Sequence, residues 1–157
     1  MDLIGKTTIH PVLFYSGKIS GYFTWVVLFL LMLHISIIDC YAVKYNTYIS
    51  YLFLIPGLIL IAVSLFNLGR STRLGLPQKE TVLKIKGLYC YSRNPMYVGF
   101  NLLTISSMVY TLNIWIILAG IYSIIIYHFI ILGEEQFLIS RFGGQYEDYL
   151  KKVRRYL

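Results

Sequence analysis

The stretch MYVGFNLLTISSMVYTLNIWIILAGIYSIIIYHFIIL, residues 96–132, decides the fold. It contains no Asp, Glu, Lys or Arg, and its two apolar runs, residues 96–112 and 114–132, are separated by little more than the letters TLN. An apolar run of roughly 17–25 residues is long enough to cross the hydrocarbon core of a bilayer as an α-helix. The stretch therefore predicts two membrane-spanning helices that a tight turn joins into an antiparallel hairpin.

Two further apolar runs without charged residues precede this hairpin, at residues 22–38 and 47–68. Over the whole chain of 157 residues only 13% are charged and 57% are hydrophobic, whereas a soluble domain carries about 25% charged residues. We therefore expect an all-α integral membrane protein with about four spanning helices, formed by residues 1–157 as a single domain. The short apolar segment 10–15 cannot span a bilayer, and we expect it at the membrane interface.

The basic residues predict how the chain is oriented. Of the 14 Lys and Arg residues, two precede the first apolar run, one follows it, six lie in the loop 69–94, and five follow the fourth run. If both termini and this loop face the cytoplasm, thirteen of the fourteen lie inside, as the positive-inside rule requires. The net charge of +7 fits contact with anionic lipid headgroups, and no soluble module remains to bind nucleic acid. Cys40 and Cys90 lie on opposite faces and lack metal-ligand spacing, so we expect free thiols and no metal site.

The segment GLYCYSRNPMYVGF, residues 87–100, opens the third apolar run with unusually polar residues. Pro95 suits the first position of a helix, where its missing N–H is not needed, and Asn94 suits the N-cap. Arg93 then lies just ahead of a helix N-terminus, which attracts anions such as carboxylates. Two interpretations remain open. The segment is ordinary helix-start chemistry at a membrane interface, where Tyr and Arg are common, or it forms a pocket.

A pair of acidic residues, Glu134 and Glu135, follows the fourth apolar run. The hairpin brings this pair to the same membrane face as Arg93. The carboxylates are either solvated or paired with Arg93, or they form with it a pocket for a ligand with separated charges. Beyond the Gly143–Gly144 pair, which we expect to interrupt the helix, apolar residues recur at helical spacing and predict an amphipathic C-terminal helix. These residues are Tyr146, Tyr149, Leu150, Val153 and Leu157.

Together, GLYCYSRNPMYVG and the later pattern E-E-x-x-L-x-x-x-F-G-x-x-Y-x-x-Y resemble the C-terminal core of the isoprenylcysteine carboxyl methyltransferase family, to which the phospholipid N-methyltransferases are related. The resemblance covers roughly residues 68–153. It implies a methyltransferase that binds S-adenosylmethionine between the two motifs. It also implies catalytic roles for Arg93 and Glu135, Arg93 orienting an anion of the acceptor or the cofactor. The cofactor-contacting positions that it implies are Val82, Leu83, Lys84, Gly87, Tyr89, Asn94, Pro95, Tyr97 and Glu134.

The chain departs from this family pattern at three places. Asn94 replaces the histidine of the family's Arg-His-Pro motif, and an amide can form hydrogen bonds but cannot carry charge. Ile130 stands where the eukaryotic enzymes carry an arginine related to the substrate. The usual Val-Pro near the C-terminus is reduced to Val153 followed by Arg154. We therefore expect a lipidic or amphiphilic acceptor of open identity rather than specifically a prenylcysteine.

Several alternatives follow from the same residues. His128 is either a general base or, as we favour, a histidine with an interior partner. The whole core is also compatible with an NADPH-dependent membrane reductase, whose sterol-reducing members resemble it, or with a non-enzymatic four-span protein. Small residues on the hairpin predict close helix packing rather than chemistry. They are Gly99, Ser106, Ser107 and Gly120.

Overall fold

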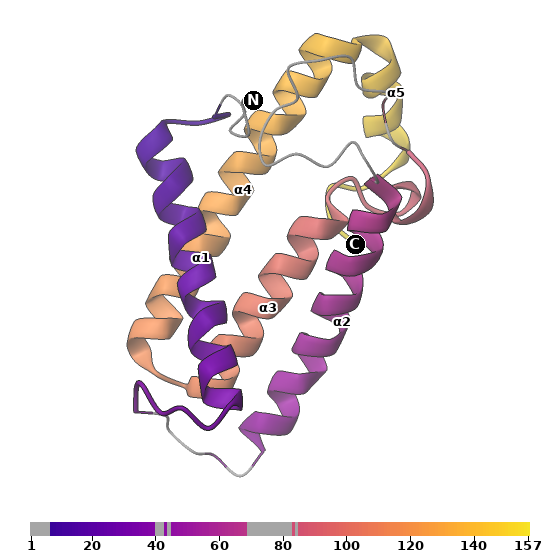
Figure 1. Ribbon diagram of the computed structural model, residues 1–157. Helices are drawn as coiled ribbons and strands as arrows, with labels where there is room; N and C mark the ends of the chain where they lie inside the picture. The colour runs from indigo at the N-terminus through magenta and orange to yellow at the C-terminus, as the bar shows by residue number, and fades with distance from the viewer. Residues whose placement is uncertain (1–6, 40–42, 44, 69–82, 84) are drawn as a thin grey trace.

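The computed structural model describes residues 7–39, 43, 45–68, 83 and 85–157 (Figure 1). Its regular elements are all helical over these residues, apart from an isolated bridge between Ser92 and Arg154, which confirms the predicted all-α class. The elements are α1 (Pro11–Met32), α2 (Asn46–Leu68), the short 3-10 helix η2 (Gly87–Cys90), α3 (Pro95–Thr111), α4 (Ile114–Phe142) and α5 (Gly144–Lys152).

The four long helices run alternately up and down, so that distant parts of the chain meet at each end of the bundle (Figure 1). At the lower end in the figure, the Asn113 side chain donates a hydrogen bond to the Asp39 carbonyl. At the upper end, the Thr8 hydroxyl donates to the carbonyl of Ile130 on α4, and the backbone N–H of Arg93 donates to the carbonyl of Arg154. We call this upper end, with the starts of α1 and α3, the end of α2 and the last turns of α4, the site end.

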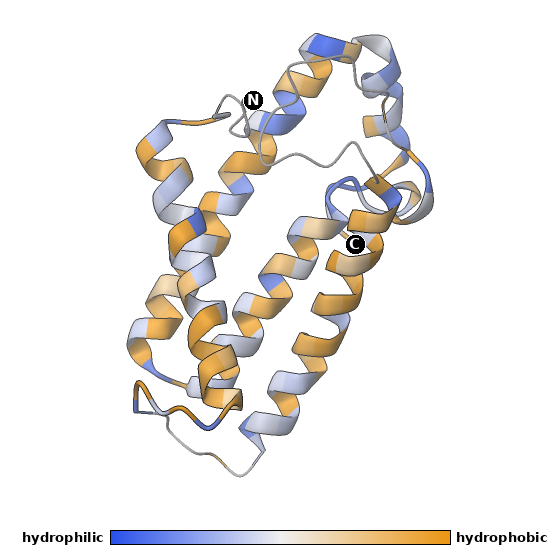
Figure 2. Ribbon diagram, viewed as in Figure 1, coloured by the Kyte–Doolittle hydropathy of each residue, from blue (hydrophilic) through white to orange (hydrophobic). Residues whose placement is uncertain are grey.

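Three of the helices, α1, α2 and α4, are long and apolar enough to cross a membrane. Apolar residues make up much of these helices, whereas polar residues gather on α5 and the last turns of α4 (Figure 2). The predicted third span corresponds to α3, whose 17 residues lie at the lower limit for crossing a bilayer. The count of four spans therefore stays a prediction, as does the cytoplasmic placement of the termini.

The predicted boundaries of the first span are wrong. The helix α1 begins at Pro11 and ends at Met32, so residues 11–15 form its first turns and are not a separate segment. Their position at the membrane interface stays a prediction. The polar residues that interrupted the apolar pattern find partners on α4. Ser20 donates to the Ala119 carbonyl at 2.9 Å, and the hydroxyls of Ser16 and Tyr122 lie 2.7 Å apart. Polar side chains satisfied in this way do not end a helix in an apolar environment.

Small residues bring the helices close together, as the sequence predicted. Gly99 on α3 faces Gly57 on α2 so closely that a methyl group built on Gly99 would lie 2.8 Å from the Gly57 carbonyl oxygen. The hydroxyls of Ser50 and Ser106 lie 2.8 Å apart across the same pair of helices. Ser107 donates to the Thr24 carbonyl of α1 at 2.7 Å. The helix α3 is thus held against both α1 and α2 by polar contacts inside the bundle.

Two short turns define the remaining geometry. Leu112 and Asn113 join α3 to α4, and the Asn113 side chain accepts a hydrogen bond from the Trp115 N–H. Gly143, at φ +53°, ends α4, and α5 begins directly after it, which confirms the predicted interruption. The C-terminal helix is shorter than predicted because it ends at Lys152. Residues 153–157 instead return along the segment before α3, where Ser92 and Arg154 form their bridge.

Candidate functional site

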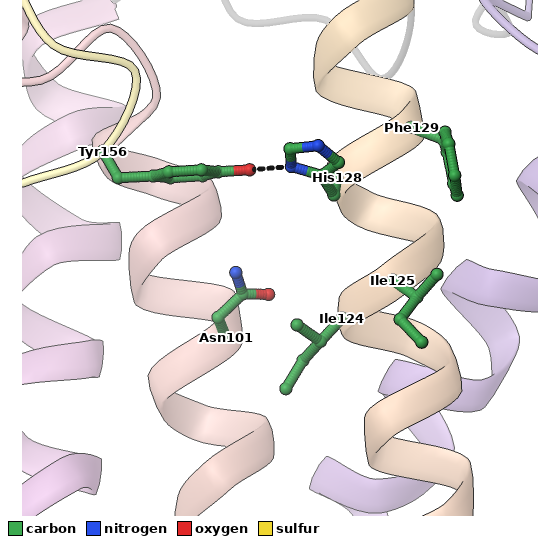
Figure 3. A pocket seen from close by; sticks show the side chains of 6 residues that line it. All are labelled: Asn101, Ile124, Ile125, His128, Phe129 and Tyr156. Carbon is green, nitrogen blue, oxygen red and sulfur yellow. Dashed lines mark hydrogen bonds between the residues drawn. The ribbon is translucent and has the colours of Figure 1, made fainter.

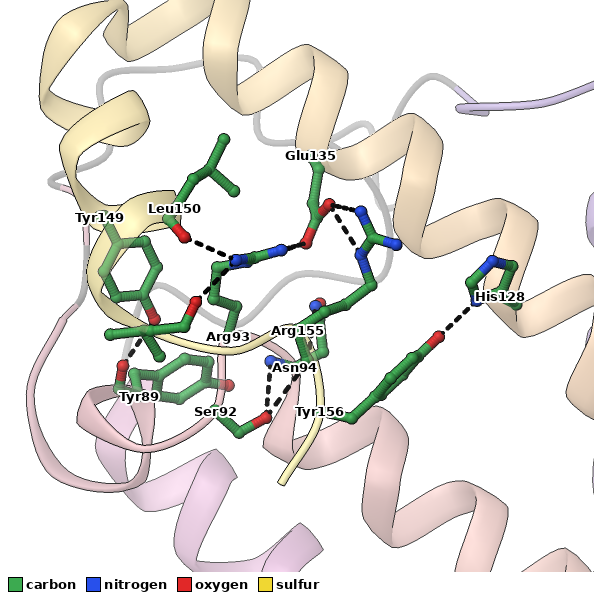
Figure 4. A network of polar contacts seen from close by, with 11 residues as sticks. Tyr89, Ser92, Arg93, Asn94, His128, Glu135, Tyr149, Leu150, Arg155 and Tyr156 are labelled. Carbon is green, nitrogen blue, oxygen red and sulfur yellow. Dashed lines mark hydrogen bonds and ion pairs between the residues drawn. The ribbon is translucent and has the colours of Figure 1, made fainter.

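The Arg93 side chain connects three elements at the site end (Figure 4). Its Nε donates to Glu135 Oε1 at 3.0 Å, and its Nη2 lies 2.8 Å from the same oxygen. Its Nη1 donates to the carbonyls of Leu150 and Val153 at 3.2 and 2.7 Å. The Arg93 and Glu135 side chains are only 9% and 7% exposed. The start of α3, the last turns of α4 and the end of α5 are therefore fastened to one another by a buried ion pair.

A second arginine completes the charge balance around Glu135. Arg155 donates from Nε to Glu135 Oε2 at 3.0 Å, and its Nη2 lies 2.9 Å from this oxygen. The hydrogen bond with Glu135 raises the pKa of Arg155 above its ordinary value. Each oxygen of the buried carboxylate thus faces its own guanidinium, an arrangement that offsets the cost of burying the charge. The interpretation in which an acidic residue pairs with Arg93 holds for Glu135.

The neighbouring acid, Glu134, lies in different surroundings. Because successive residues of a helix point about 100° apart, Glu134 faces the inside of the bundle, where the Tyr97 hydroxyl donates to its Oε1 at 2.7 Å. Lys18 of α1 is the cation that interacts with it electrostatically, and the Lys18 ammonium lies 4.1 Å from the centre of the Phe14 ring. The two adjacent carboxylates are therefore unequal. Among the residues that the structure describes, Glu135 has two arginine partners, whereas Glu134 has one hydroxyl partner and a more distant cation.

Tyr89 links η2 to the C-terminal helix, since its carbonyl accepts a hydrogen bond of 2.6 Å from the Tyr149 hydroxyl. Burial raises the pKa of both tyrosines, that of Tyr149 to about 12. The Ser64 hydroxyl of α2 lies near the Tyr89 side chain, but Ser64 Oγ is buried without a hydrogen-bond partner among the described residues. The phenol groups of Tyr89 and Tyr149 therefore stay neutral at physiological pH.

Gly87 lies against the end of α2. Its φ of +65° favours glycine, and a side chain at this position would collide with the Asn67 amide. Asn67 Nδ2 is buried and has no hydrogen-bond partner among the described residues. A buried donor without an acceptor costs about 1–3 kcal/mol, so a polar group of a ligand is a fitting partner for this amide.

The structure places the remaining predicted cofactor-contacting residues in different surroundings. Pro95 is buried at the first position of α3 as expected. Asn94 occupies the N-cap position of α3 as predicted, but its side chain forms no capping hydrogen bond. It donates instead to the Arg155 carbonyl at 3.3 Å, because the returning C-terminal residues offer this acceptor. Leu83 is partly buried, while Val82 and Lys84 lie outside the described residues.

His128 has an interior partner, in agreement with the interpretation that we favoured. Its Nδ1 lies 2.6 Å from the Tyr156 hydroxyl (Figure 4).

Cys90 is a free, exposed thiol. Cys40 lies outside the described residues.

Four residues at the site end escaped the sequence analysis: Lys18, Ser64, Asn67 and Arg155. A signal for Ser64 and Asn67 existed, because two polar residues three apart at the end of an apolar helix lie on one face. A lysine inside an apolar helix, such as Lys18, is likewise a functional signal by default. Arg155 offered none, since the return of residues 153–157 is set by contacts with the start of α3.

Comparisons with known proteins show to which proteins this chain is similar. A family model described as phospholipid methyltransferase matches residues 45–145. Protein-S-isoprenylcysteine O-methyltransferase of Schizosaccharomyces pombe is 36% identical over 78 residues, which are 48% of this chain and 32% of the relative. The chain thus covers about a third of the length of that relative. No solved structure gives a significant match.

Proposed function

The chain belongs to the phospholipid methyltransferase family, and we propose that it is a membrane-embedded methyltransferase that transfers the methyl group of S-adenosylmethionine to a lipidic or amphiphilic acceptor. The matched residues 45–145 include Arg93, Tyr97 and the acidic pair. The relative from Schizosaccharomyces pombe is named as a methyltransferase as well. Activity, cofactor and acceptor are all part of this proposal.

One observation carries the proposal: two motifs that lie some forty positions apart meet at the site end. Arg93 pairs with Glu135, and Tyr97 binds Glu134. Both contacts join the start of α3 to the last turns of α4. A site at one end of an apolar bundle suits a polar cofactor that arrives from the water and an acceptor that arrives from the bilayer.

The donors and acceptors at the site end fit S-adenosylmethionine, which carries a carboxylate, an ammonium, a sulfonium and ribose hydroxyls. The Asn67 amide is buried without a partner among the described residues and can donate to an oxygen atom. The Ser64 hydroxyl lies beside the Tyr89 side chain near this amide. The Glu134 carboxylate accepts one hydrogen bond from Tyr97 and keeps capacity to accept more, which suits a cationic group. We therefore assign these residues, with Gly87 and Tyr89, to the cofactor site.

The role of the protein in such a reaction is positional. S-adenosylmethionine supplies, when bound, a methyl group on a positively charged sulfur. Glu134 balances positive charge, and Tyr97 holds the carboxylate in one orientation. The catalytic roles of Arg93 and Glu135 stay a prediction, and their pairing with each other fixes the start of α3 and the last turns of α4 in one geometry. Fixed geometry of this kind lowers a barrier by avoiding the entropy cost of aligning reactants.

The proposal is tested by transfer of tritiated methyl from S-adenosylmethionine into a total membrane lipid extract by the purified chain. We expect radioactivity in a lipid fraction. Tyr97→Phe removes the hydroxyl that orients Glu134, and hydrogen bonds to charged groups contribute about 1.5–3 kcal/mol. Transfer should therefore fall about tenfold or more.

The matched control is Tyr91→Phe, because Tyr91 is 73% exposed near the same end, and its transfer should equal that of the unaltered chain. No transfer by the unaltered chain into any lipid fraction would contradict the proposal. An equal loss of methyl transfer in Tyr97→Phe and Tyr91→Phe would contradict a specific role of Tyr97.

A further inference from the structure

A cavity of about 420 Å³ lies between α3 and α4, beside the C-terminal residues (Figure 3). Its volume falls in the range of about 300–1,000 Å³ in which small-molecule sites occur. Ile125 and Phe129 are each about half exposed on α4, so the cavity opens on the apolar side of the bundle. Its lining consists of Asn101, Ile124, Ile125, His128, Phe129 and Tyr156.

Asn101 is the polar residue of this cavity that lacks a partner. Its Oδ1 is buried and has no hydrogen-bond partner among the described residues. In Figure 3 its amide points from α3 toward α4 and the Ile124 side chain. Buried polar side-chain atoms normally have at least one hydrogen-bond partner. An unpartnered acceptor beside isoleucine and phenylalanine therefore calls for a ligand with a hydrogen-bond donor and a hydrocarbon chain.

The other polar pair of the cavity closes it toward the site end. His128 Nδ1 lies 2.6 Å from the Tyr156 hydroxyl (Figure 3). Tyr156 follows Arg155, which binds Glu135, and His128 precedes Glu135 by two helical turns on the same face of α4. The cavity thus lies directly next to the charged network, on its side toward the middle of the bundle.

We propose that this cavity is the acceptor site: it binds a long-chain amphiphile whose hydroxyl or amine donates a hydrogen bond to Asn101 Oδ1, while its chain lies along Ile124, Ile125 and Phe129. This inference extends the proposed function and rests on it, because the bound amphiphile is a methyl acceptor only if the chain is a methyltransferase. The binding itself does not depend on the methyl donor. The cavity selects for a donor-bearing head group, so an alkane of the same length is a poor ligand.

Photolabelling of the full chain in lipid nanodiscs tests the proposal. The probe is hexadecanol with a diazirine in its chain, and labelled peptides are identified by mass spectrometry. We expect labelling to concentrate on the peptides that contain Asn101 and residues 124–129. Excess unlabelled hexadecanol or hexadecylamine should compete, and hexadecane should not. Asn101→Leu keeps the size of the side chain but removes the acceptor, so labelling should fall roughly three- to tenfold.

A matched pair of variants separates the cavity from the general lipid surface. Ile125 lines the cavity and Ile121 does not, although both are partly exposed on α4, 49% and 44% respectively. Ile125→Trp should abolish the labelling of residues 124–129, and Ile121→Trp should leave it intact. Thermal unfolding shows that each variant is folded before it is compared.

Three results would overturn the acceptor site: labelling spread evenly over lipid-facing helices, competition by hexadecane equal to that by hexadecanol, or equal effects of the two tryptophan variants. Retention of radioactive S-adenosylmethionine is measured on the same samples. Cofactor retention without cavity labelling refutes this inference alone. Cavity labelling without cofactor retention refutes the proposed function and leaves an amphiphile site.

Discussion

Arg93 is the residue on which the site end depends most. It forms four contacts with Glu135, Leu150 and Val153, and both members of the ion pair are almost fully buried. Breaking a buried pair by removing one partner leaves an uncompensated charge and typically costs about 3–5 kcal/mol. Arg93 therefore stabilises the fold through this ion pair, whether or not it also contacts a substrate.

We predict that Arg93→Ala lowers the free energy of unfolding by about 3–5 kcal/mol, measured by denaturant unfolding in detergent. Arg93→Lys should recover little of this loss, because one ammonium group cannot reach a carboxylate and two carbonyls in the fork geometry of a guanidinium. Arg155→Ala is the control. Its side chain is 35% exposed, so its loss should be clearly smaller. Equal losses for Arg93→Ala and Arg155→Ala would contradict the account.

Tyr149 makes stability depend on pH in the alkaline range. Burial raises its pKa from an ordinary value of about 10 to about 12, so the neutral phenol is favoured in the fold. The stability that neutral Tyr149 contributes is therefore fully present below about pH 10 and is lost as the pH rises through about 12. We expect the unfolding temperature to fall across this window.

In Tyr149→Phe the decline should be shallower, though not absent, since burial also raises the pKa of Tyr89 and Tyr146. At neutral pH this variant should be less stable, by about 0.5–1.5 kcal/mol, because it loses the hydrogen bond to the Tyr89 carbonyl. A decline as steep as in the unaltered chain would show that Tyr149 does not titrate in this window.

At this scale, sequence reasoning predicted the meeting of Arg93 with the acidic pair, because the hairpin alone brings both to one end. It did not distinguish the two acids. The distinction depends on the path of residues 153–157, which places Arg155 beside Glu135. Glu135 is therefore paired with two arginines, Arg93 and Arg155. Asn94 is the N-cap residue of α3 as predicted, but its side-chain amide donates to the Arg155 carbonyl instead of capping the helix.

At the scale of elements, the helices pack through small residues. A methyl group on Gly99 would lie 2.7 Å from an Ile61 side-chain carbon and 2.8 Å from the Gly57 carbonyl oxygen, and both distances are shorter than van der Waals contact. The backbone of α2 cannot yield without separating from α3. Gly99 therefore matters for the distance between these two helices and hence for the site end that they share.

We predict that Gly99→Ala lowers the free energy of unfolding by about 1–3 kcal/mol, the usual cost of overpacking. Gly144→Ala is the matched control, because nothing lies within 4 Å of a methyl group at that position. Since Gly144 begins α5, alanine there should be neutral or stabilising, by up to about 1 kcal/mol. Thermal unfolding of Gly99→Ala and Gly144→Ala in the same detergent measures the two changes in stability. A stable Gly99→Ala would mean that α2 and α3 are not in close contact.

The apolar runs predicted these elements because a bilayer leaves the backbone few alternatives to a helix. The start of α1 was missed because the polar segment 16–20 separates the apolar segment 10–15 from the apolar run 22–38. The partners of Ser16 and Ser20 on α4 explain why the helix continues through them. The end of α5 was missed for the opposite reason: helical spacing continues to Leu157 in the sequence, but the chain leaves the helix at Lys152 to form contacts with Ser92 and Arg93.

At the scale of the whole molecule, alternation of four helices places the start of α3 and the last turns of α4 at one end of an apolar bundle (Figure 1). There, Glu134 keeps capacity to bind a cation while Glu135 holds the frame. The central claim of our account is that this end binds a cofactor with separated charges, and that the two adjacent acids divide the tasks of binding and stability.

Calorimetric titration of the purified chain with S-adenosylmethionine tests this claim most directly. We predict that the unaltered chain binds, and that Glu134→Gln weakens binding about tenfold or more through loss of a charged acceptor. Glu147→Gln, at an exposed position on α5, should bind as the unaltered chain does. Absence of binding heat from the unaltered chain, or equal affinity after Glu134→Gln, would contradict the claim.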